Sequence, residues 1–198
     1  MTDLYYSNKM EDMRKGIKKY IYIMNNVKNV NVSIYKSEFQ RKYNGFYRVQ
    51  RRSENWYKTY FTILETNKNN ISLSFYDVLF EMYNKFDRVE TSFSSKLLHT
   101  VNPSMPIYDS KVVEAIGVPK IQGENRFNKA LTNYKLLCDK YAVYFQTQNC
   151  REAIMLFDTY FPEFANKISD VKKIDFFLWK FSKEELKELN VFTELIGG

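Results

Sequence analysis

Several residue types that define common protein classes are scarce in this sequence. Its 198 residues include 2 cysteines, 1 histidine, 6 glycines and 4 prolines. Cys138 and Cys150 alone make no disulfide framework, which fits a reducing cytoplasm, and with one histidine they cannot build the usual zinc sites. Few glycines and 17% aromatic residues exclude a collagen-like or disordered chain. We therefore expect a folded cytoplasmic protein that holds no metal or other cofactor.

Long apolar segments are also missing. Runs such as Ile174–Trp179 are interrupted by Asp175 and are far shorter than the ~18 apolar residues that a membrane span needs. Near the N-terminus, the run Tyr20–Met24 is too short for the apolar core of a signal peptide. We therefore expect no membrane association and no secretory signal in this segment. The length of the chain favours one domain with a sizeable core.

Positive charge is concentrated in the first third of the chain. Residues 1–70 carry 14 Lys and Arg against 6 Asp and Glu, a net charge of +8, whereas the whole chain carries +7. Residues 71–149 are near neutral at +1, and residues 150–198 carry −2. A bias toward AT-rich codons can raise the lysine total, so the position of the charge is more informative than its sum. A basic surface favours an acidic partner, nucleic acid first.

Arginine, which such a codon bias does not explain, clusters in this third among aromatic residues. On one continuous helix, Arg41, Arg48 and Arg52 would share a face. Guanidinium and aromatic planes together suit phosphate contact and base stacking. The alternative is a solvated helix face whose aromatic side chains turn into the core. The first interpretation predicts a DNA-binding surface formed by Arg41, Arg48, Arg51, Arg52, Trp56 and Tyr57.

Apolar residues recur at helical spacing along most of the chain, and no segment alternates convincingly as a strand would. Ser53, Ser74 and Asp109 are well placed to cap helices, and Ser182 with Glu185 forms a capping box. We therefore expect an all-α, compact multi-helix domain, in which residues 1–70 form a basic lobe and residues 71–198 a second lobe. The expected helices span 3–27, 33–49, 53–66, 74–86, 94–101, 110–116 (closed by Gly117), 124–146, 150–160 and 169–180, with a last one after Ser182.

The segment Phe93–Gly117 is the densest candidate for chemistry. Lys96 begins a short apolar helix, prolines break the chain, and Asp109 begins the next helix. A lysine amine beside a carboxylate can act as the nucleophile of a Schiff-base reaction, provided that desolvation or a nearby cation removes its proton. His99 lies three residues after Lys96, on the same side of the helix. The plainer alternatives are a surface lysine, a structural histidine and an aspartate that only caps its helix.

At these residues the sequence resembles the helix-hairpin-helix DNA glycosylases, in particular their 8-oxoguanine glycosylase-like branch, over about 40 residues. The segments that resemble the helix-hairpin-helix are Tyr76–Phe86, Asp87–Phe93 and Ser94–Val101. The resemblance implies that Lys96 is the nucleophilic lysine and that Asp109 is the catalytic aspartate. Two differences stand out: the hairpin contains Glu90 but no glycine, and Lys96 and Asp109 are only 13 positions apart.

The resemblance implies a base-flipping enzyme that removes a damaged or modified base from DNA. Lys96 would attack C1′ of the sugar, Asp109 would stabilise positive charge on it, and His99 and Tyr108 would line the pocket. The same pattern is similar to uncharacterised bacterial and phage proteins. Two alternatives stay open: an inactive nucleic-acid-binding module, and a protein that binds and blocks a protein partner, for which the many aromatic residues are suited.

Overall fold

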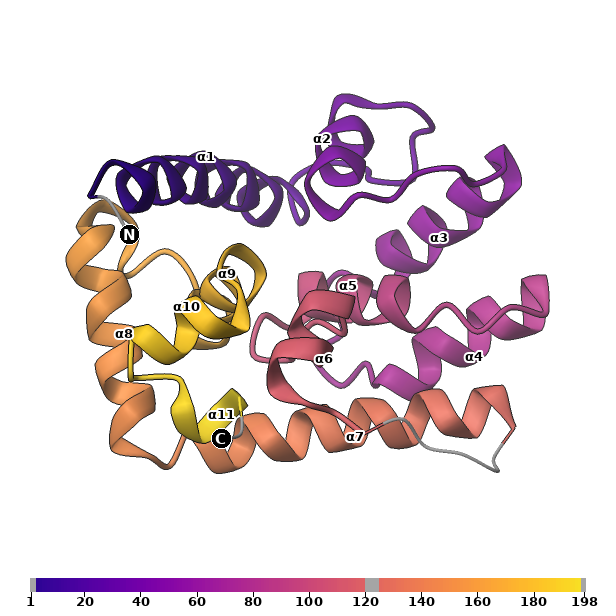
Figure 1. Cartoon of the computed structure of the whole chain (residues 1–198). Helices are drawn as coiled ribbons and strands as arrows, with labels where there is room; N and C mark the ends of the chain where they lie inside the picture. Colours follow the sequence, from indigo (N-terminus) through magenta and orange to yellow (C-terminus); the bar gives the residue numbers. More distant parts are fainter. Residues whose placement is uncertain (1–2, 120–124, 197–198) are drawn as a thin grey trace. The chain divides into compact units, whose positions relative to one another are not determined.

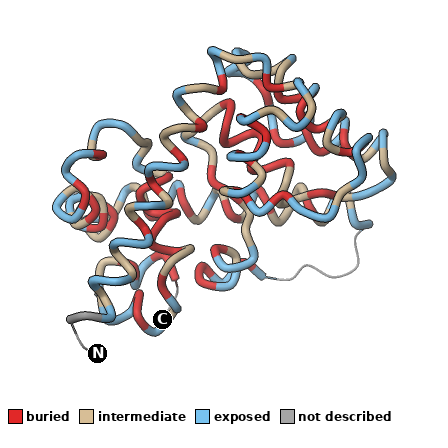
Figure 2. The backbone as a smooth tube through the Cα atoms, turned by 90° about the horizontal axis from the view of Figure 1, so that it is seen from above, coloured by how far each residue is buried: buried red, intermediate tan, exposed pale blue. Residues whose placement is uncertain are grey.

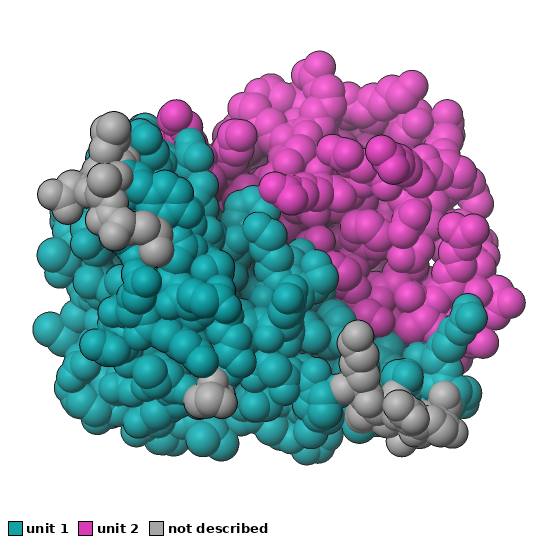
Figure 3. Space-filling view, in the orientation of Figure 1, with its two compact units in different colours: residues 1–14, 103–198 teal, residues 15–102 magenta. Residues whose placement is uncertain are grey.

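The computed structural model describes residues 3–119 and 125–196, and every regular element among them is helical (Figure 1). The expectation of an all-α chain is therefore confirmed. The chain forms two compact units, which Figure 3 colours separately: unit 1 comprises residues 1–14 and 103–198, and unit 2 comprises residues 15–102. The division after residue 102 differs from the lobe boundary expected at residue 70. Residue 70 instead lies inside unit 2, between two helices that pack against each other.

Unit 2 contains two of the four helices whose N-caps were expected from the sequence. Ser53 and Ser74 act as N-caps, as expected, and Ser74 forms a complete capping box with Asp77. The second helix is shorter than expected, because Ser37 caps its start and Arg48 ends it in a left-handed conformation. The helices of unit 2 are the second part of α1 (Asp3–Asn26), α2 (Glu38–Tyr47), α3 (Glu54–Asn67), α4 (Phe75–Phe86) and α5 (Thr91–Val101).

The connection between α4 and α5 is tighter than the sequence indicated. Asp87 adopts a left-handed conformation, and its N–H donates to the carbonyl oxygen of Tyr83, which ends α4. Helix α5 begins at Thr91 rather than near Ser94, so only four residues link the two helices. The helices pack against each other and against α3. This arrangement places α5 in the interior of unit 2.

Aromatic side chains fill the core of unit 2. Tyr43, Tyr60 and Phe61 are completely buried. The two phenol oxygens of Tyr43 and Tyr60 lie 2.8 Å apart, and the hydroxyl of Tyr60 donates to the carbonyl oxygen of Phe93 at 2.9 Å. Tyr43 therefore donates to Tyr60, and burial raises the pKa of both phenols. Hydrogen bonds thus satisfy the polar ends of these large rings inside the core.

Unit 1 is built around α9. This helix contacts α6, α8 and α10, and its residues from Lys172 to Leu178 are all buried. The predicted caps at Asp109 and Ser182 are confirmed, and Gly117 closes α6 with a φ of 68°. The start expected at residue 124 lies outside the described residues. The further elements of unit 1 are α6 (Ser110–Ile116), α7 (Arg126–Tyr144), α8 (Gln148–Tyr160), a 3₁₀ turn (Pro162–Phe164), α9 (Asp170–Lys180), α10 (Lys183–Glu188) and α11 (Thr193–Ile196).

Buried and exposed positions alternate along the helices of both units (Figure 2). Helix α9 departs from this pattern because it is buried on all sides yet carries charged residues. Its Lys172 pairs with Asp175, and Lys173 lies 2.8 Å from Asp158 of α8 and 3.0 Å from Asp170. Buried charges are tolerated when they are paired in this way, because an isolated one would lose its hydration without compensation.

Replacing Ser74 with alanine should lower the free energy of unfolding by about 1 kcal/mol. Its Oγ accepts from the N–H of Asp77 at 3.2 Å, and its own N–H donates to the Asp77 carboxylate at 2.9 Å. Chemical denaturation measures the effect, with Ser72→Ala as the control, since Ser72 is exposed and precedes the cap. Equal stabilities of the two variants would contradict the capping role.

The stability contributed by Glu185 should depend on pH. Burial by itself would raise the pKa of Glu185, but the Lys9 ammonium, 2.5 Å away, and the N–H of Ser182 outweigh it and hold that pKa at about 2. An unfolded glutamate titrates at about 4.3. The stabilisation should therefore be complete above pH ~4.5 and disappear as the pH falls toward 2.

We expect Glu185→Gln to be less stable than the native chain at pH 7, with a difference that shrinks below pH ~4.5. Denaturant unfolding across this pH range measures it, and Glu194→Gln, at an exposed position of α11, is the control. A difference that stays constant with pH would show that the ion pair with Lys9 does not supply the stabilisation.

Candidate nucleic-acid interface

The net positive charge of the chain belongs to unit 2. Its residues 15–102 include 15 Lys and Arg against 7 Asp and Glu, a net charge of +8, whereas unit 1 has 15 against 16. Twelve of the 15 basic residues of unit 2 are exposed. The positive excess is therefore a property of the surface of one compact unit, which is the footprint expected of a nucleic-acid-binding protein.

Arg41, Arg48 and Arg51 are exposed but do not lie on one helix. Helix α2 carries Arg41 and ends at Tyr47, while Arg48 and Arg51 lie in the link to α3. Both link arginines have positive φ angles, 54° and 59°. This conformation costs a non-glycine residue about 1 kcal/mol or more. Arg41, Arg48 and Arg52 would share a face only on one continuous helix. They do not, because α2 ends at Tyr47 and the chain turns before α3 begins at Glu54.

Arg52, Trp56 and Tyr57 each form contacts within unit 2. The Arg52 guanidinium lies 3.1 Å from the Glu90 carboxylate and 4.9 Å from the centre of the Phe93 ring. Trp56 is only 2% exposed and stacks on Tyr60, so a base cannot stack on its ring. Tyr57 is half-buried and donates its hydroxyl to the carbonyl oxygen of Val49 at 3.0 Å. For Trp56, the alternative of an aromatic side chain turned into the core describes the structure, whereas Arg52 and Tyr57 are partly exposed.

A polar groove between α3 and α4 was not predicted from the sequence. Its volume is about 520 Å³; both helices supply an amide and an ammonium group, α3 adds two hydroxyls and α4 adds the Glu81 carboxylate. Such side chains make most of the contacts to phosphates and sugars in protein–DNA complexes. Polar residues recur on the outer face of the helix expected over 53–66, and this pattern could have indicated a polar surface there. The polar residues that line the groove are Asn55, Lys58, Thr59, Thr62, Glu81, Asn84 and Lys85.

Lys96 lies on α5, a buried helix of unit 2 that also carries several polar side chains. Every residue of α5 from Ser94 to Val101 is buried, and Lys96 is 7% exposed. Its ammonium lies 5.4 Å from the centre of the Phe93 ring, and its carbonyl oxygen accepts from Thr100 Oγ1 at 2.8 Å. The alternative of a surface lysine is therefore excluded. Burial provides the desolvation that a lysine nucleophile requires.

His99 is completely buried on the same helix. Its Nε2 lies 3.0 Å from the hydroxyl of Tyr20, and the two rings pack with centres 5.7 Å apart. A histidine with no exposed surface does not line an open pocket. The structural role, which was the alternative for His99, is the one that these interactions support.

Asp109 and Tyr108 belong to unit 1. Asp109 caps α6, since its Oδ1 accepts from the N–H of Lys111 at 3.1 Å. Tyr108 is half-buried, and burial raises the pKa of its phenol against the opposing effect of a hydrogen bond with Asn133. Lys96 lies in unit 2 and Asp109 in unit 1. That their side chains face one shared cleft therefore stays a prediction. The capping role does not compete with a role toward substrate, since a carboxylate has two oxygens.

No family model, curated protein or solved structure matches this chain. The resemblance to the helix-hairpin-helix glycosylases therefore stays a hypothesis that rests on Lys96, Asp109 and the segments around them. Among residues 3–119 and 125–196, no helix has the length and hydropathy needed to cross a membrane. In the same ranges, His, Cys, Asp and Glu residues form no group of three that could hold a metal ion.

Arg52→Ala should lower the free energy of unfolding by about 1–3 kcal/mol, because it leaves the buried Glu90 carboxylate without its charged partner. Arg51→Ala should change it by less than about 0.5 kcal/mol, since Arg51 is exposed. Denaturant unfolding of both variants makes the comparison. Similar losses for the two arginines would contradict the division between interior and surface roles.

Proposed function

We propose that the chain binds DNA through unit 2. The observation that carries this proposal is the confinement of the positive excess to that unit, with twelve exposed basic side chains. Phosphate binding to such a surface releases counterions, which supplies much of the affinity of DNA-binding proteins. Arg41, Arg48 and Arg51 offer guanidinium groups, and the groove between α3 and α4 offers amides, hydroxyls and ammonium groups.

The triple variant Arg41→Gln/Arg48→Gln/Arg51→Gln should bind duplex DNA more weakly and with a shallower salt dependence. The slope of log affinity against log salt should fall by about 0.9 for each phosphate that the variant no longer neutralises. A matched control removes the same charge from exposed positions of unit 1: Lys135→Gln/Lys167→Gln/Lys187→Gln. Fluorescence anisotropy at several salt concentrations measures both.

Equal reductions of affinity in the two triple variants would assign the effect to net charge rather than to the arginines. Binding that is absent from the native chain, or that does not depend on salt, would overturn the proposal.

We further propose that the bound DNA is a substrate from which Lys96 removes a damaged or modified base. The Lys96 Nζ would form a bond to C1′ while the bond from C1′ to the base breaks, and the base would leave with the electron pair. The departing base takes up a proton. The bond from C1′ to the ring oxygen then breaks, a proton passes from Nζ to that oxygen, and a Schiff base forms between Nζ and C1′. The burial of Lys96 supports this role, and the roles of Asp109 and of base flipping come from the glycosylase resemblance.

Borohydride trapping tests the chemistry, because it reduces a Schiff base to a stable covalent adduct. We expect an adduct with duplex oligonucleotides that carry 8-oxoguanine or another damaged base, and none with Lys96→Gln. Lys135→Gln, at an exposed position of α7 in unit 1, is the control and should form the adduct as the native chain does. A base-release assay detects an enzyme that depends on Asp109 alone.

A non-enzymatic DNA-binding module is the second candidate. The link between α4 and α5 favours it, since the link contains no glycine and its Glu90 is buried against Arg52. Glycosylases of the resembled family use a glycine-rich hairpin there, whose amides approach a DNA phosphate closely. Salt-dependent binding without an adduct or base release across a broad set of lesions would identify this second function.

A further inference from the structure

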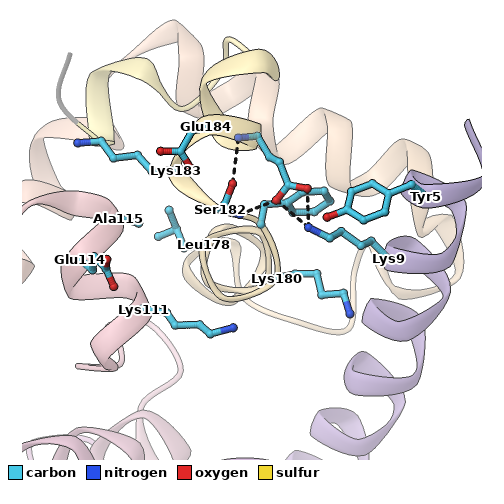
Figure 4. Close-up of a pocket in the computed structure, with 12 residues that line it drawn as sticks. Tyr5, Lys9, Lys111, Glu114, Ala115, Leu178, Lys180, Ser182, Lys183 and Glu184 are labelled. Carbon is cyan, nitrogen blue, oxygen red and sulfur yellow. Dashed lines mark hydrogen bonds and ion pairs between the residues drawn. The ribbon is translucent and has the colours of Figure 1, made fainter. Parts of the chain in front are cut away.

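Unit 1 contains an open cavity of about 660 Å³ that the proposed DNA-binding function does not use (Figure 4). Residues of α1, α6, α9 and α10 line it, all of them in unit 1. The volume falls within the range of about 300–1,000 Å³ that is typical of sites for small molecules. The chemistry of the lining side chains indicates what such a molecule would be.

Ammonium groups surround the cavity. Lys9, Lys111, Lys180 and Lys183 come from four different helices. In Figure 4, Lys9, Lys111 and Lys180 extend from their helices around the end of α9, and Lys183 extends away from them. Lysines from four helices that line one cavity favour an anionic ligand there.

Two of these ammonium groups are available to an incoming anion. Lys9 forms an ion pair with Glu185, whose side chain is 5% exposed, and is therefore not one of the two. Lys180, in contrast, lies 3.0 Å from Asp12, which is 60% exposed, and exposed ion pairs contribute little. The Lys111 ammonium donates to the carbonyl oxygen of Trp179 at 3.4 Å, which is a long hydrogen bond. A phosphate can therefore recruit Lys111 and Lys180 at small cost.

Part of the remaining lining is apolar and aromatic. Ala115, Leu178 and Phe181 form buried parts of the wall, and each is at most 5% exposed. The ring of Tyr5 also lines the cavity and is 42% exposed, so one face can stack on a flat ring. Glu114 adds an exposed carboxylate, which can accept from hydroxyl or amine groups.

We propose that this cavity binds a nucleoside phosphate, with the phosphate on Lys111 and Lys180 and the base against Tyr5. A ligand with only one of these features would leave much of the lining unused, since the cavity combines cations, an aromatic ring, an apolar wall and the exposed carboxylates of Glu114 and Glu184. The proposal is independent of DNA binding, because it involves unit 1 alone.

Isothermal titration calorimetry with adenosine 5′-monophosphate tests the proposal, with adenosine and inorganic phosphate as separate ligands. We expect saturable binding of the nucleotide, and binding at least about tenfold weaker for either fragment. Lys111→Gln/Lys180→Gln should weaken nucleotide binding about tenfold or more and leave adenosine binding unchanged. Tyr5→Ala should weaken the binding of the nucleotide and of adenosine.

Two controls separate this site from general charge effects. Lys135→Gln/Lys167→Gln removes the same charge from exposed positions of unit 1 outside the cavity, and should bind the nucleotide as the native chain does. The Arg41/Arg48/Arg51 triple variant should also keep its nucleotide affinity, even if it no longer binds DNA. No saturable binding, equal affinity for nucleotide and adenosine, or equal reductions of affinity in the cavity and control variants would overturn the proposal.

Discussion

The burial of charged and polar groups on two central helices is the constraint on which both units depend. In unit 2, α5 buries Lys96, His99 and three hydroxyl residues, and in unit 1, α9 buries two lysines and Asp175. Taking such groups out of water is unfavourable unless partners replace the lost hydration. The neighbouring helices are therefore held to particular positions: α1 must bring Tyr20 to His99, and α8 must bring Asp158 to Lys173. Apolar packing alone would accept many small shifts of these helices, whereas the hydrogen bonds and ion pairs do not.

Much of the fold could be predicted because its local signals agree with its packing. Ser53, Ser74, Asp109 and Ser182 each cap the helix that follows, since a side-chain oxygen at that position satisfies an amide that the helix leaves unpaired. The end of α2 was less predictable. It depends on Arg48 in a left-handed conformation, which nothing in an arginine side chain favours, so the turn is imposed by the packing of unit 2. One of the two boundaries between the units was also hidden, because it falls within α1, whereas the other lies at Pro103.

The candidate site was predictable in its residue types and not in their surroundings. Arg52 and Trp56 have the same chemistry as residues that bind phosphates and bases. Arg52 instead pairs with Glu90, 38 positions later, and Trp56 packs on Tyr60 inside the unit. No local pattern could indicate that pairing, since it depends on how α5 packs against α3. Lys96 shows the opposite case. Its position at the start of a helix suited a surface lysine. Its burial follows from α5 being enclosed by its neighbours, and it is the one buried lysine or arginine of residues 15–102.

The two units differ in how they carry positive charge, and that difference bears on the ligands each can recognise. In unit 2 the cations are numerous, exposed and spread over several helices and their links, so their field extends over a wide surface. Such a field suits a polymer whose charges repeat at regular intervals. In unit 1 the total charge is close to zero, but four lysines and an aromatic ring line one cavity. A near-neutral unit exerts little long-range attraction on a polyanion, so a ligand of that cavity must gain its affinity from short-range interactions, which favour a small molecule of matching shape.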